Sequence, residues 1–381
     1  MARNKLKKLL ISVFYIIDVI IPKNKKLFVA GSSHGRSLFG NPKALFHYIN
    51  TFEKDYQCFF LIKDRKKADV NSNIYYNLSF KGLWIFFRSK YLLMSHGSGD
   101  FYLYNGIFSR RKTVIQCWHG VPLKCMGFRE IPDIPEKSQK EILLNNKRMD
   151  LFLTSSFQEK ESIHQCFHIE ESKILVTGRA CIDTVLSPLK ESGFHTDSGM
   201  FNILYALTYR PGSESVFFPF SDFDLEELIE FLENNNICIY LRAHVNEVNQ
   251  IMSLNSDHIR VFPFSDYPDI YDYLSSFQCL ITDYSSLYID FLVLDRPLLF
   301  IPYDLEQYKQ NPGLLYEDYD SVTPGDKIPD FSSLKKQLLD IRSGIDRNRD
   351  KRNKVNNFFN RGIAENSSSR VFSDIIKNEQ N

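Results

Sequence analysis

The sequence lacks a strong net charge, paired cysteines and a glycine-rich nucleotide loop, and each absence excludes a class of protein. The formal net charge is +1 over 381 residues, so no overall field favours nucleic acid as a partner. The seven cysteines are scattered without a Cys-x-x-Cys pair, which predicts buried free thiols in a reducing compartment. No dinucleotide fingerprint, Walker loop, Gly-x-Ser-x-Gly elbow or His-Glu-x-x-His sequence occurs.

The amino-terminal segment is basic and apolar at once. Its first 26 residues carry seven Lys or Arg and one acidic residue, around an apolar run from Leu9 to Ile21. The run is short for a membrane span and lacks a small-residue cleavage site. Residues 1–22 are therefore predicted to form an amphipathic helix that associates peripherally with the anionic cytoplasmic face of a membrane. A helix packed on the protein core is the alternative.

From residue 23 onward, strand-like and helix-like segments alternate, which is typical of doubly wound parallel sheets. A polar stretch at 191–199 interrupts the pattern and predicts a domain boundary there. The expected domains are 23–190 and 191–345, with a helical tail at 346–381 that packs back on the first domain. The expected strands of the first domain are Lys26–Gly31, Tyr56–Ile62, Tyr91–Ser95, Thr113–Cys117, Leu151–Ser155 and Ile174–Gly178.

The second domain repeats this alternation, and two such domains predict a cleft between them. Its expected strands are Asn202–Leu207, Ile237–Leu241, Ile259–Phe262, Cys279–Thr282 and Leu298–Pro302. Its expected helices are Asp224–Asn234, Asp269–Phe277 and Leu287–Leu294.

The strand Thr113–Cys117 is followed, after Trp118, by His119 and Gly120, and Pro122 stops the strand from continuing. This order places the His119 imidazole at the carboxyl edge of a sheet, where open α/β sheets bind ligands. Histidine suits proton transfer near neutral pH, and Gly120 allows close backbone approach. A structural histidine in a loop is the alternative interpretation of this segment.

A second strand, Cys279–Thr282, runs into Asp283, Ser285 and Ser286 before a helix-like segment. Hydroxyls beside free backbone N–H groups at a helix start can bind phosphate without a metal. The same residues are also good helix caps, so capping is the competing interpretation.

Other strand ends deliver cationic or polar groups. Arg242 and His244 share strand parity and suit a diphosphate, although a surface pair is the alternative. Arg210 follows the first strand of the second domain, and Ser33 and His96 follow strands of the first domain. With no metal-holding aspartate pair near a strand end, these groups favour a reaction on a phosphorylated substrate without a metal or other cofactor.

An ordered set of motifs resembles the CDP-glycerol glycerophosphotransferase family, the primases and polymerases of teichoic acids and related capsular polymers. The resemblance covers roughly Phe28 to Tyr308. The matching segments are Asn41-Pro42-Lys43, Trp118-His119-Gly120-x-Pro122-Leu123-Lys124, Leu207-Thr208-Tyr209-Arg210, Arg242-Ala243-His244, Thr282-Asp283-Tyr284-Ser285-Ser286-Leu287-Tyr288-Ile289-Asp290-Phe291, Arg296-Pro297 and Tyr303-Asp304-Leu305-Glu306-Gln307-Tyr308.

The resemblance implies a GT-B-like α/β fold of two Rossmann-type domains facing across a cleft. It implies transfer of glycerol phosphate, or another polyol phosphate, from a CDP-activated donor to a hydroxyl of a lipid-linked or polymeric glycan, with release of CMP. His119 would be the general base. The implied donor-binding residues are Arg210, Arg242, His244, Asp283, Ser285 and Ser286, and the implied supporting residues are Gly120, Lys124, Ser33 and His96.

The chain departs from the family pattern at a few positions. Val121 stands where relatives commonly have Thr, Cys181 stands at an arginine position, and Arg-Ala-His-Val replaces Arg-Pro-His-Pro. Two other functions remain open on the sequence: a GT-B glycosyltransferase that uses a nucleotide sugar, and a catalytically silent binding protein of the same fold.

Overall fold

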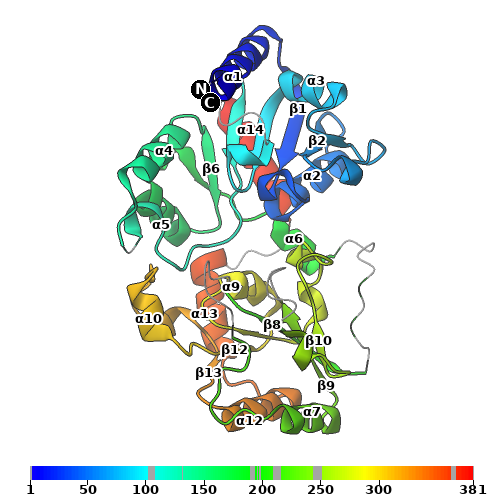
Figure 1. Ribbon diagram of the computed structural model, residues 1–381, viewed down its shortest axis with the longest axis vertical. Helices are drawn as coiled ribbons and strands as arrows, with labels where there is room; N and C mark the ends of the chain where they lie inside the picture. Colours follow the sequence, from blue (N-terminus) through cyan, green and yellow to red (C-terminus); the bar gives the residue numbers. More distant parts are fainter. Residues whose placement is uncertain are drawn as a thin grey trace. The chain divides into compact units, whose positions relative to one another are not determined.

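The computed structural model describes residues 2–101, 108–130, 132–188, 194, 196, 199–208, 216–242, 251–361 and 366–380, with side chains from residue 11 to residue 379. Within it the chain forms two compact units (Figure 1). Unit 1 consists of Met1–His119, Ile134–Asp183 and Glu365–Asn381, and unit 2 consists of Gly120–Asp133 and Thr184–Ala364.

Unit 1 is built on a seven-stranded sheet of order β3-β2-β1-β4-β5-β6-β7, in which all neighbouring strands are parallel. Its strands are β1 Asn24–Gly31, β2 Gln57–Ile62, β3 Ile74–Tyr76, β4 Ser89–Met94, β5 Thr113–Gln116, β6 Leu151–Thr154 and β7 Ile174–Val176. Its helices are α1 Ala2–Ile20, α2 Gly40–Phe52, α3 Phe80–Arg88, α4 Glu136–Asn146, α5 Phe157–Phe167 and α14 Ser367–Gln380, and α6 Cys181–Leu186 starts in this unit.

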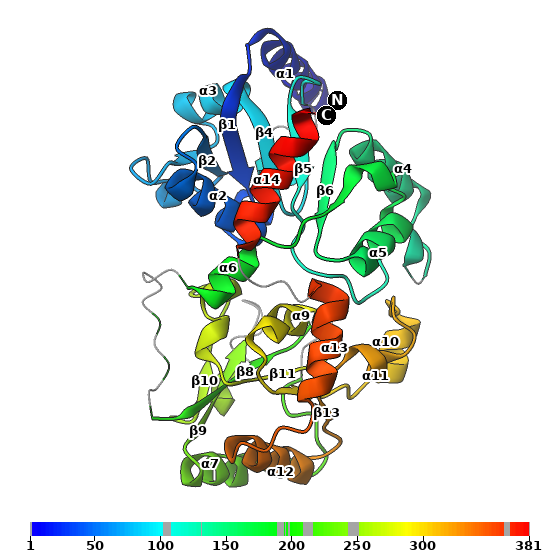
Figure 2. The ribbon, with the colours of Figure 1, turned by 180° about the vertical axis from the view of Figure 1, so that it is seen from behind.

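Side chains of β1 alternate between the two faces of this sheet. Phe28 and Ala30 pack with α2 and α14 on one face, whereas Val29 packs with α1 and α3 on the other. Figures 1 and 2 show α14 lying along the first of these faces beside α2. The sheet is therefore covered on both faces, as its apolar strands require.

Unit 2 has a six-stranded parallel sheet of order β10-β9-β8-β11-β12-β13. Its strands are β8 Phe201–Ala206, β9 Ile237–Arg242, β10 Ile259–Val261, β11 Cys279–Thr282, β12 Leu298–Phe300 and β13 Asp326–Lys327. Its helices are α7 Leu225–Asn234, α9 Leu287–Phe291, α10 Leu305–Gln310, α11 Tyr319–Val322, α12 Phe331–Arg342 and α13 Arg349–Asn360.

The core of unit 2 forms where α7 and α12 pack on the sheet. Leu228 and Leu232 of α7 and Leu334 of α12 join the strand residues there. The predicted helix Asp269–Phe277 is wrong in type, because the chain there forms two short 3-10 turns, Ile270–Asp272 and Leu274–Ser276. The two parallel sheets confirm the predicted pair of doubly wound α/β domains.

The unit boundaries differ from those predicted. Residues 120–133 belong to unit 2, because Leu123 and Cys125 form backbone hydrogen bonds with Leu315 and Gly313. The chain passes into unit 2 again after Asp183 rather than at residue 190. A single domain boundary in the sequence cannot describe residues 120–133, because the chain returns to unit 1 at Ile134.

The predicted tail is divided between the units. Helix α13 stays in unit 2, where Arg352 is buried and pairs with Asp295 and Asp346. Only α14 returns to unit 1, where the Asp183 carboxylate accepts the backbone N–H groups of Ser367 and Ser368 at 2.9 and 2.7 Å. An acidic group at a helix start satisfies N–H groups that have no partner within the helix.

Helix α1 is held on unit 1 by a buried carboxylate. Asp18 is 1% exposed, and its oxygens lie 2.8 Å from Lys23 Nζ and 3.2 Å from Lys112 Nζ. The same carboxylate accepts the Ser109 N–H at 2.7 Å. Beside it, Phe14 stacks on Phe87 with ring centroids 5.7 Å apart. The alternative interpretation of residues 1–22, a helix packed on the protein core, is thus correct for this side of α1.

The opposite side of α1 is apolar and exposed. Val13, Ile16 and Ile20 are 44%, 55% and 69% exposed, and their spacing places them along one helix face. No helix in the described part of the chain is both long and apolar enough to cross a bilayer. All seven cysteines are buried free thiols, as predicted.

The Asp18 cluster makes a stability prediction. Asp18→Asn leaves two buried ammonium groups without their counter-charge, which costs about 3–5 kcal/mol and lowers Tm by roughly 10 °C. Thermal unfolding followed by fluorescence measures this shift. The control is Asp55→Asn, which removes the exposed Lys26–Asp55 pair and changes stability by less than about 0.5 kcal/mol. Equal shifts for both variants would contradict the buried cluster.

Candidate functional site

In unit 1, three predicted site residues follow three strands that are neighbours in the sheet. Ser33 follows β1, His96 follows β4 and His119 follows β5, and the order β1-β4-β5 brings their loops to one edge. The Ser33 N–H donates to Ser95 Oγ at 3.3 Å, which ties the first two loops together. The structure therefore brings Ser33, His96 and His119 into one cluster.

Three imidazole rings lie side by side in this cluster. The rings of His96 and His119 stack with centroids 4.4 Å apart and an interplanar angle of 7°, and His34 lies 5.0 Å from His96. Burial, with the neighbouring His119 and His34, lowers the pKa of His96 to about 3. His96 is thus neutral near pH 7 and imposes no charge repulsion on His119.

Hydrogen bonding fixes the tautomer of His119. Its Nδ1 lies 3.1 Å from the Ser95 carbonyl oxygen, which can only accept. In the neutral imidazole, Nδ1 therefore carries the proton and Nε2 carries the lone pair. This is the form that a general base needs.

A buried carboxylate that the sequence did not reveal holds these loops. Asp100 is 1% exposed and accepts the backbone N–H groups of His34, Ser95 and His96 at 2.7, 2.8 and 2.9 Å. Burial raises the pKa of Asp100, while the three N–H donors act against that rise. Only the fold brings Asp100 into contact with the residues that follow β1.

Asn41 holds the backbone that leads to His119. Its Nδ2 donates to the carbonyl oxygens of Cys117 and Trp118 at 2.8 and 3.2 Å, and its Oδ1 accepts the Cys181 N–H at 3.1 Å. Trp118 itself has a φ of 56°, a conformation that is costly for a residue with a Cβ. The Asn41 bonds, and a bond from the Trp118 N–H to Gln116 Oε1 at 3.0 Å, stabilise this turn.

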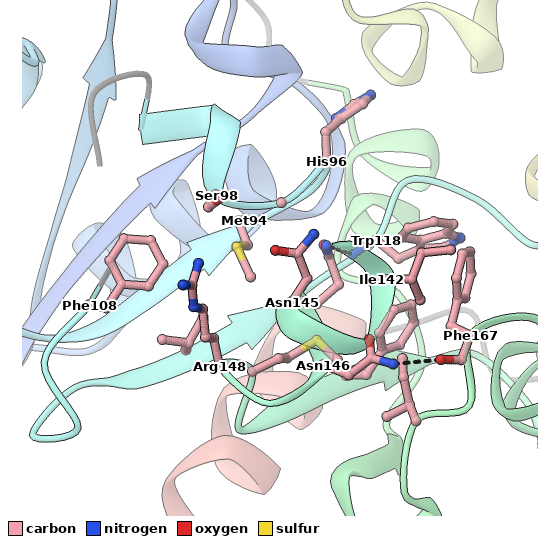
Figure 3. A pocket seen from close by; sticks show the side chains of 16 residues that line it. Met94, His96, Ser98, Phe108, Trp118, Ile142, Asn145, Asn146, Arg148 and Phe167 are labelled. Carbon is pink, nitrogen blue, oxygen red and sulfur yellow. Dashed lines mark hydrogen bonds between the residues drawn. The ribbon is translucent and has the colours of Figure 1, made fainter. Parts of the chain in front are cut away.

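A cavity of about 270 Å³ opens in unit 1 beside these rings (Figure 3). Trp118 and His96 form part of its wall, and α4 and the residues after it form another part. The Trp118 ring also lies 4.4 Å from the His119 ring. The cavity is therefore adjacent to both rings that flank His119.

Gly120 is the first residue of unit 2, and its φ of 151° favours glycine. A Cβ at this position would lie 3.3 Å from Ser286 Oγ, so a side chain would crowd that hydroxyl. Lys124 is exposed and pairs with Leu314 in an isolated antiparallel bridge. Both residues thus lie in a segment that joins unit 2.

In unit 2, Asp283 is buried at the end of β11. Its Oδ1 accepts the Thr208 N–H at 2.8 Å and the Thr208 hydroxyl at 2.7 Å. The Tyr319 hydroxyl donates to the Asp283 carbonyl at 2.8 Å. The Asp283 carboxylate therefore joins the carboxyl ends of β11 and β8.

The next residue, Tyr284, anchors the serine loop. Its ring stacks on Tyr308 at 4.0 Å with an interplanar angle of 18°, and its hydroxyl donates to Asp304 at 2.9 Å. Asp304 and Tyr308 belong to the sequence motif at 303–308. The structure thus assigns that motif a supporting role.

The two serines after Tyr284 are half-buried and precede α9. Ser286 occupies the cap position, but its side chain makes no capping hydrogen bond. Ser285 Oγ lies 3.4 Å from the Leu287 N–H, a long contact. Capping therefore accounts poorly for the Ser286 hydroxyl.

Arg242 ends β9, beside Ala206 of β8. Its guanidinium carbon lies 5.2 and 5.4 Å from the ring centroids of Phe262 and Phe264. Burial lowers its pKa to about 10, so the group remains charged near pH 7. Among the described residues, its buried Nη1 has no hydrogen-bond acceptor, a costly arrangement that an anionic ligand would relieve.

The two remaining predicted donor residues, Arg210 and His244, lie outside the described residues. The ends of β8, β9 and β11 still share one edge of the sheet, because these strands are neighbours and parallel. The structure thus places Arg242, Asp283, Ser285 and Ser286 at or next to that edge.

Comparison with known proteins identifies relatives across nearly the whole chain. The family model described as CDP-Glycerol:Poly(glycerophosphate) glycerophosphotransferase matches residues 13–377. A teichoic acid glycerol-phosphate transferase of Staphylococcus aureus (strain NCTC 8325 / PS 47) is 28% identical over 368 residues, covering 90% of this chain and 91% of the relative. A teichoic acid poly(glycerol phosphate) polymerase of Bacillus spizizenii (strain ATCC 23059 / NRRL B-14472 / W23) is 28% identical over 350 residues, covering 84% and 86%.

A solved structure shares the fold. The wall teichoic acid polymerase TagF superposes with a TM-score of 0.80 and 20% identity, over 99% of this chain and 95% of that chain. This likeness confirms the predicted GT-B-like fold class.

The hydrogen bond at His119 makes a spectroscopic prediction. Long-range ¹H–¹⁵N correlation spectra of the histidine-labelled protein at pH 7 or above should show the neutral His119 ring protonated on Nδ1. Comparison with His119→Gln assigns the signals, and His168→Asn, at an exposed left-handed position, serves as the control. A proton on Nε2 instead would contradict the bond to the Ser95 carbonyl.

Proposed function

Because the chain belongs to the CDP-glycerol:poly(glycerophosphate) glycerophosphotransferase family, we propose that it transfers glycerol phosphate, or a related polyol phosphate, from a CDP-activated donor. The acceptor is a hydroxyl of a lipid-linked or polymeric glycan, and CMP is released. The observation that carries the proposal is the His119 imidazole, which is held as the tautomer with its lone pair on Nε2.

The transfer is one displacement at phosphorus. The acceptor oxygen forms a bond to the phosphorus that carries the glycerol, and the bridging bond to CMP breaks with its electron pair leaving on CMP. His119 Nε2 takes the acceptor proton. His96 remains neutral beside the imidazolium that forms, so it adds no positive charge there.

The donor diphosphate is assigned to unit 2. Arg242 supports this assignment because its buried Nη1 lacks an acceptor among the described residues, and Ser285 and Ser286 add hydroxyls at the end of β11. The resemblance assigns Arg210 and His244 to the same diphosphate. The buried bonds of Asp283 to Thr208 favour a positioning role for that carboxylate, since a carboxylate repels phosphate.

The proposed reaction uses no metal and no cofactor beyond the CDP donor. Arginine, histidine and hydroxyl groups would neutralise the charge that develops on the phosphoryl oxygens. The nearby carboxylate, Asp283, is already bonded to Thr208.

Release of CMP tests the proposal. CDP-glycerol and membrane acceptor, assayed in EDTA, should yield CMP, and His119→Ala should lower the rate about 10²–10⁴-fold because the general base is lost. His168→Asn, an exposed histidine of the same unit, should retain the rate.

Three results would overturn parts of this proposal. Absence of CMP with every CDP-alditol tried would reject the transfer. Release of a nucleoside diphosphate from a nucleotide sugar would support the glycosyltransferase alternative. An unchanged rate in His119→Ala would reject the base assignment.

We also propose that α1 attaches the enzyme to the anionic cytoplasmic face of a membrane. Its exposed row of Val13, Ile16 and Ile20 lies on the side away from the buried Asp18, and lysines flank its apolar run in the sequence. Apolar burial together with basic charge is the combination that holds such helices at an interface.

Vesicle binding tests this attachment. Ile16→Ser with Ile20→Ser should weaken binding to vesicles containing an anionic phospholipid by roughly tenfold or more, because apolar area is lost. Flotation measures the bound fraction. Phe52→Ser removes an exposed apolar side chain from α2 and should change nothing. Equal binding of the double variant and the unmodified protein would contradict the proposed attachment.

A further inference from the structure

Two phenylalanine rings that no sequence motif singled out lie against the guanidinium of Arg242. Phe262 directly follows β10, and its N–H donates to the Leu241 carbonyl of the neighbouring strand β9 at 2.8 Å. Arg242 is the next residue of β9, and its guanidinium carbon lies 5.2 Å from the Phe262 ring centroid and 5.4 Å from that of Phe264. Both distances fall within the range of a favourable contact between a cation and an aromatic face.

Packing fixes the ring of Phe262. The residue is 1% exposed, and Tyr267 stacks on its ring with centroids 4.2 Å apart and an interplanar angle of 14°. Tyr273 and Phe277 meet the same ring edge to face, at 5.5 and 5.9 Å. Phe262 cannot turn without breaking these contacts, so it offers Arg242 a rigid surface.

Phe264 supplies the second ring from a turn. The Pro263 carbonyl, one residue before it, accepts the N–H groups of Asp266 and Tyr267 at 3.3 and 3.2 Å, which closes the turn. Phe264 is half-buried, whereas Phe262 belongs to the core. Substitution of Phe264 therefore tests the ring contact while the core of unit 2 stays filled.

Ring contacts and hydrogen bonds use different parts of a guanidinium. The flat face of the group stacks on aromatic rings, whereas its five N–H donors lie in its plane. Arg242 can therefore rest on both rings and still direct its donors to an anion. Its buried Nη1 has no acceptor among the residues that the structure describes, so a donor remains for a ligand.

The surroundings also keep this group charged. Burial lowers the pKa of Arg242 to about 10, and the charges of Asp269 and Tyr273 act against that fall. Asp269 is itself buried, and its carboxylate accepts the Tyr271 N–H at 3.3 Å. Arg242 is thus a cation near pH 7, as binding of a diphosphate requires.

We propose that Phe262 and Phe264 are positioning residues that set the plane of the Arg242 guanidinium for the donor diphosphate. The rings act through Arg242, whose in-plane donors meet the phosphate oxygens. A side chain that is already oriented loses less conformational freedom when the ligand binds, which strengthens binding. This inference rests on the proposed role of Arg242 in donor binding.

Binding of inorganic pyrophosphate in EDTA, measured by isothermal titration calorimetry, tests the ring contact without catalysis. Phe264→Leu removes the ring but stays apolar, and it should weaken binding roughly three- to tenfold. Phe264→Tyr keeps the ring and should bind within about twofold of the unmodified protein. Arg242→Gln should weaken binding roughly tenfold or more, and in its presence Phe264→Leu should have no further effect.

A matched control makes the same substitution at another ring of unit 2. Phe201 starts β8, and the guanidinium carbon of the exposed Arg342 lies 5.9 Å from its ring centroid. The start of β8 lies at the opposite edge of the parallel sheet from Arg242, which ends β9. Phe201→Leu should therefore leave pyrophosphate binding unchanged.

Several results would overturn the inference. These are the absence of pyrophosphate binding, equal affinity of Phe264→Leu and the unmodified protein, loss of binding in Phe264→Tyr, or an equal effect of Phe264→Leu with and without Arg242. Ring-dependent binding without CMP release from any CDP-alditol would uphold the positioning role and reject the transfer. CMP release with unchanged pyrophosphate affinity in Phe264→Leu would do the reverse, so the two can fail separately.

Discussion

Parallel pairing of neighbouring strands is the constraint on which the candidate site residues of each unit depend. In unit 1 the order β1-β4-β5 brings the loops after three strands to one edge, and His119 stacks there on His96. In unit 2 the order β9-β8-β11 does the same for Arg242 and the residues after Asp283. Because all strands of a parallel sheet end on the same side, groups distant in sequence become neighbours.

Buried polar side chains then fix the loops that the sheets bring together. Asn41 bonds the two carbonyls before His119, and Asp100 binds three N–H groups of the adjoining loops. Asp283 and Tyr284 perform the same task in unit 2. These groups are buried and hydrogen-bonded, so moving any loop would leave a polar atom unsatisfied. The proposed catalytic and binding groups are thereby held in place by other, buried residues.

The sequence predicted the strands well because buried strands are short apolar runs bounded by turns. Strand β11 has the predicted bounds, and β1 and β9 differ by one or two residues at their ends. Two strands were missed: β3 and β13 are three and two residues long, too short for a pattern. The segment 269–277 was predicted as a helix because its apolar spacing is helical, but local turns interrupt it.

The sequence by itself determined the strand ends that carry the proposed site residues and, through its ordered motifs, the family. It pointed to His119, Arg242 and Ser286 because each follows an apolar strand. Only the tertiary structure decided the His119 tautomer, the neutral state of His96 and the role of Asp100. These properties arise from burial and from contacts between segments far apart in the sequence, such as His119 with Ser95 and His34 with Asp100, and neither can be read from local pattern. The tertiary structure also decided that the chain enters unit 2 at Gly120, because this depends on the hydrogen bond between Leu123 and Leu315.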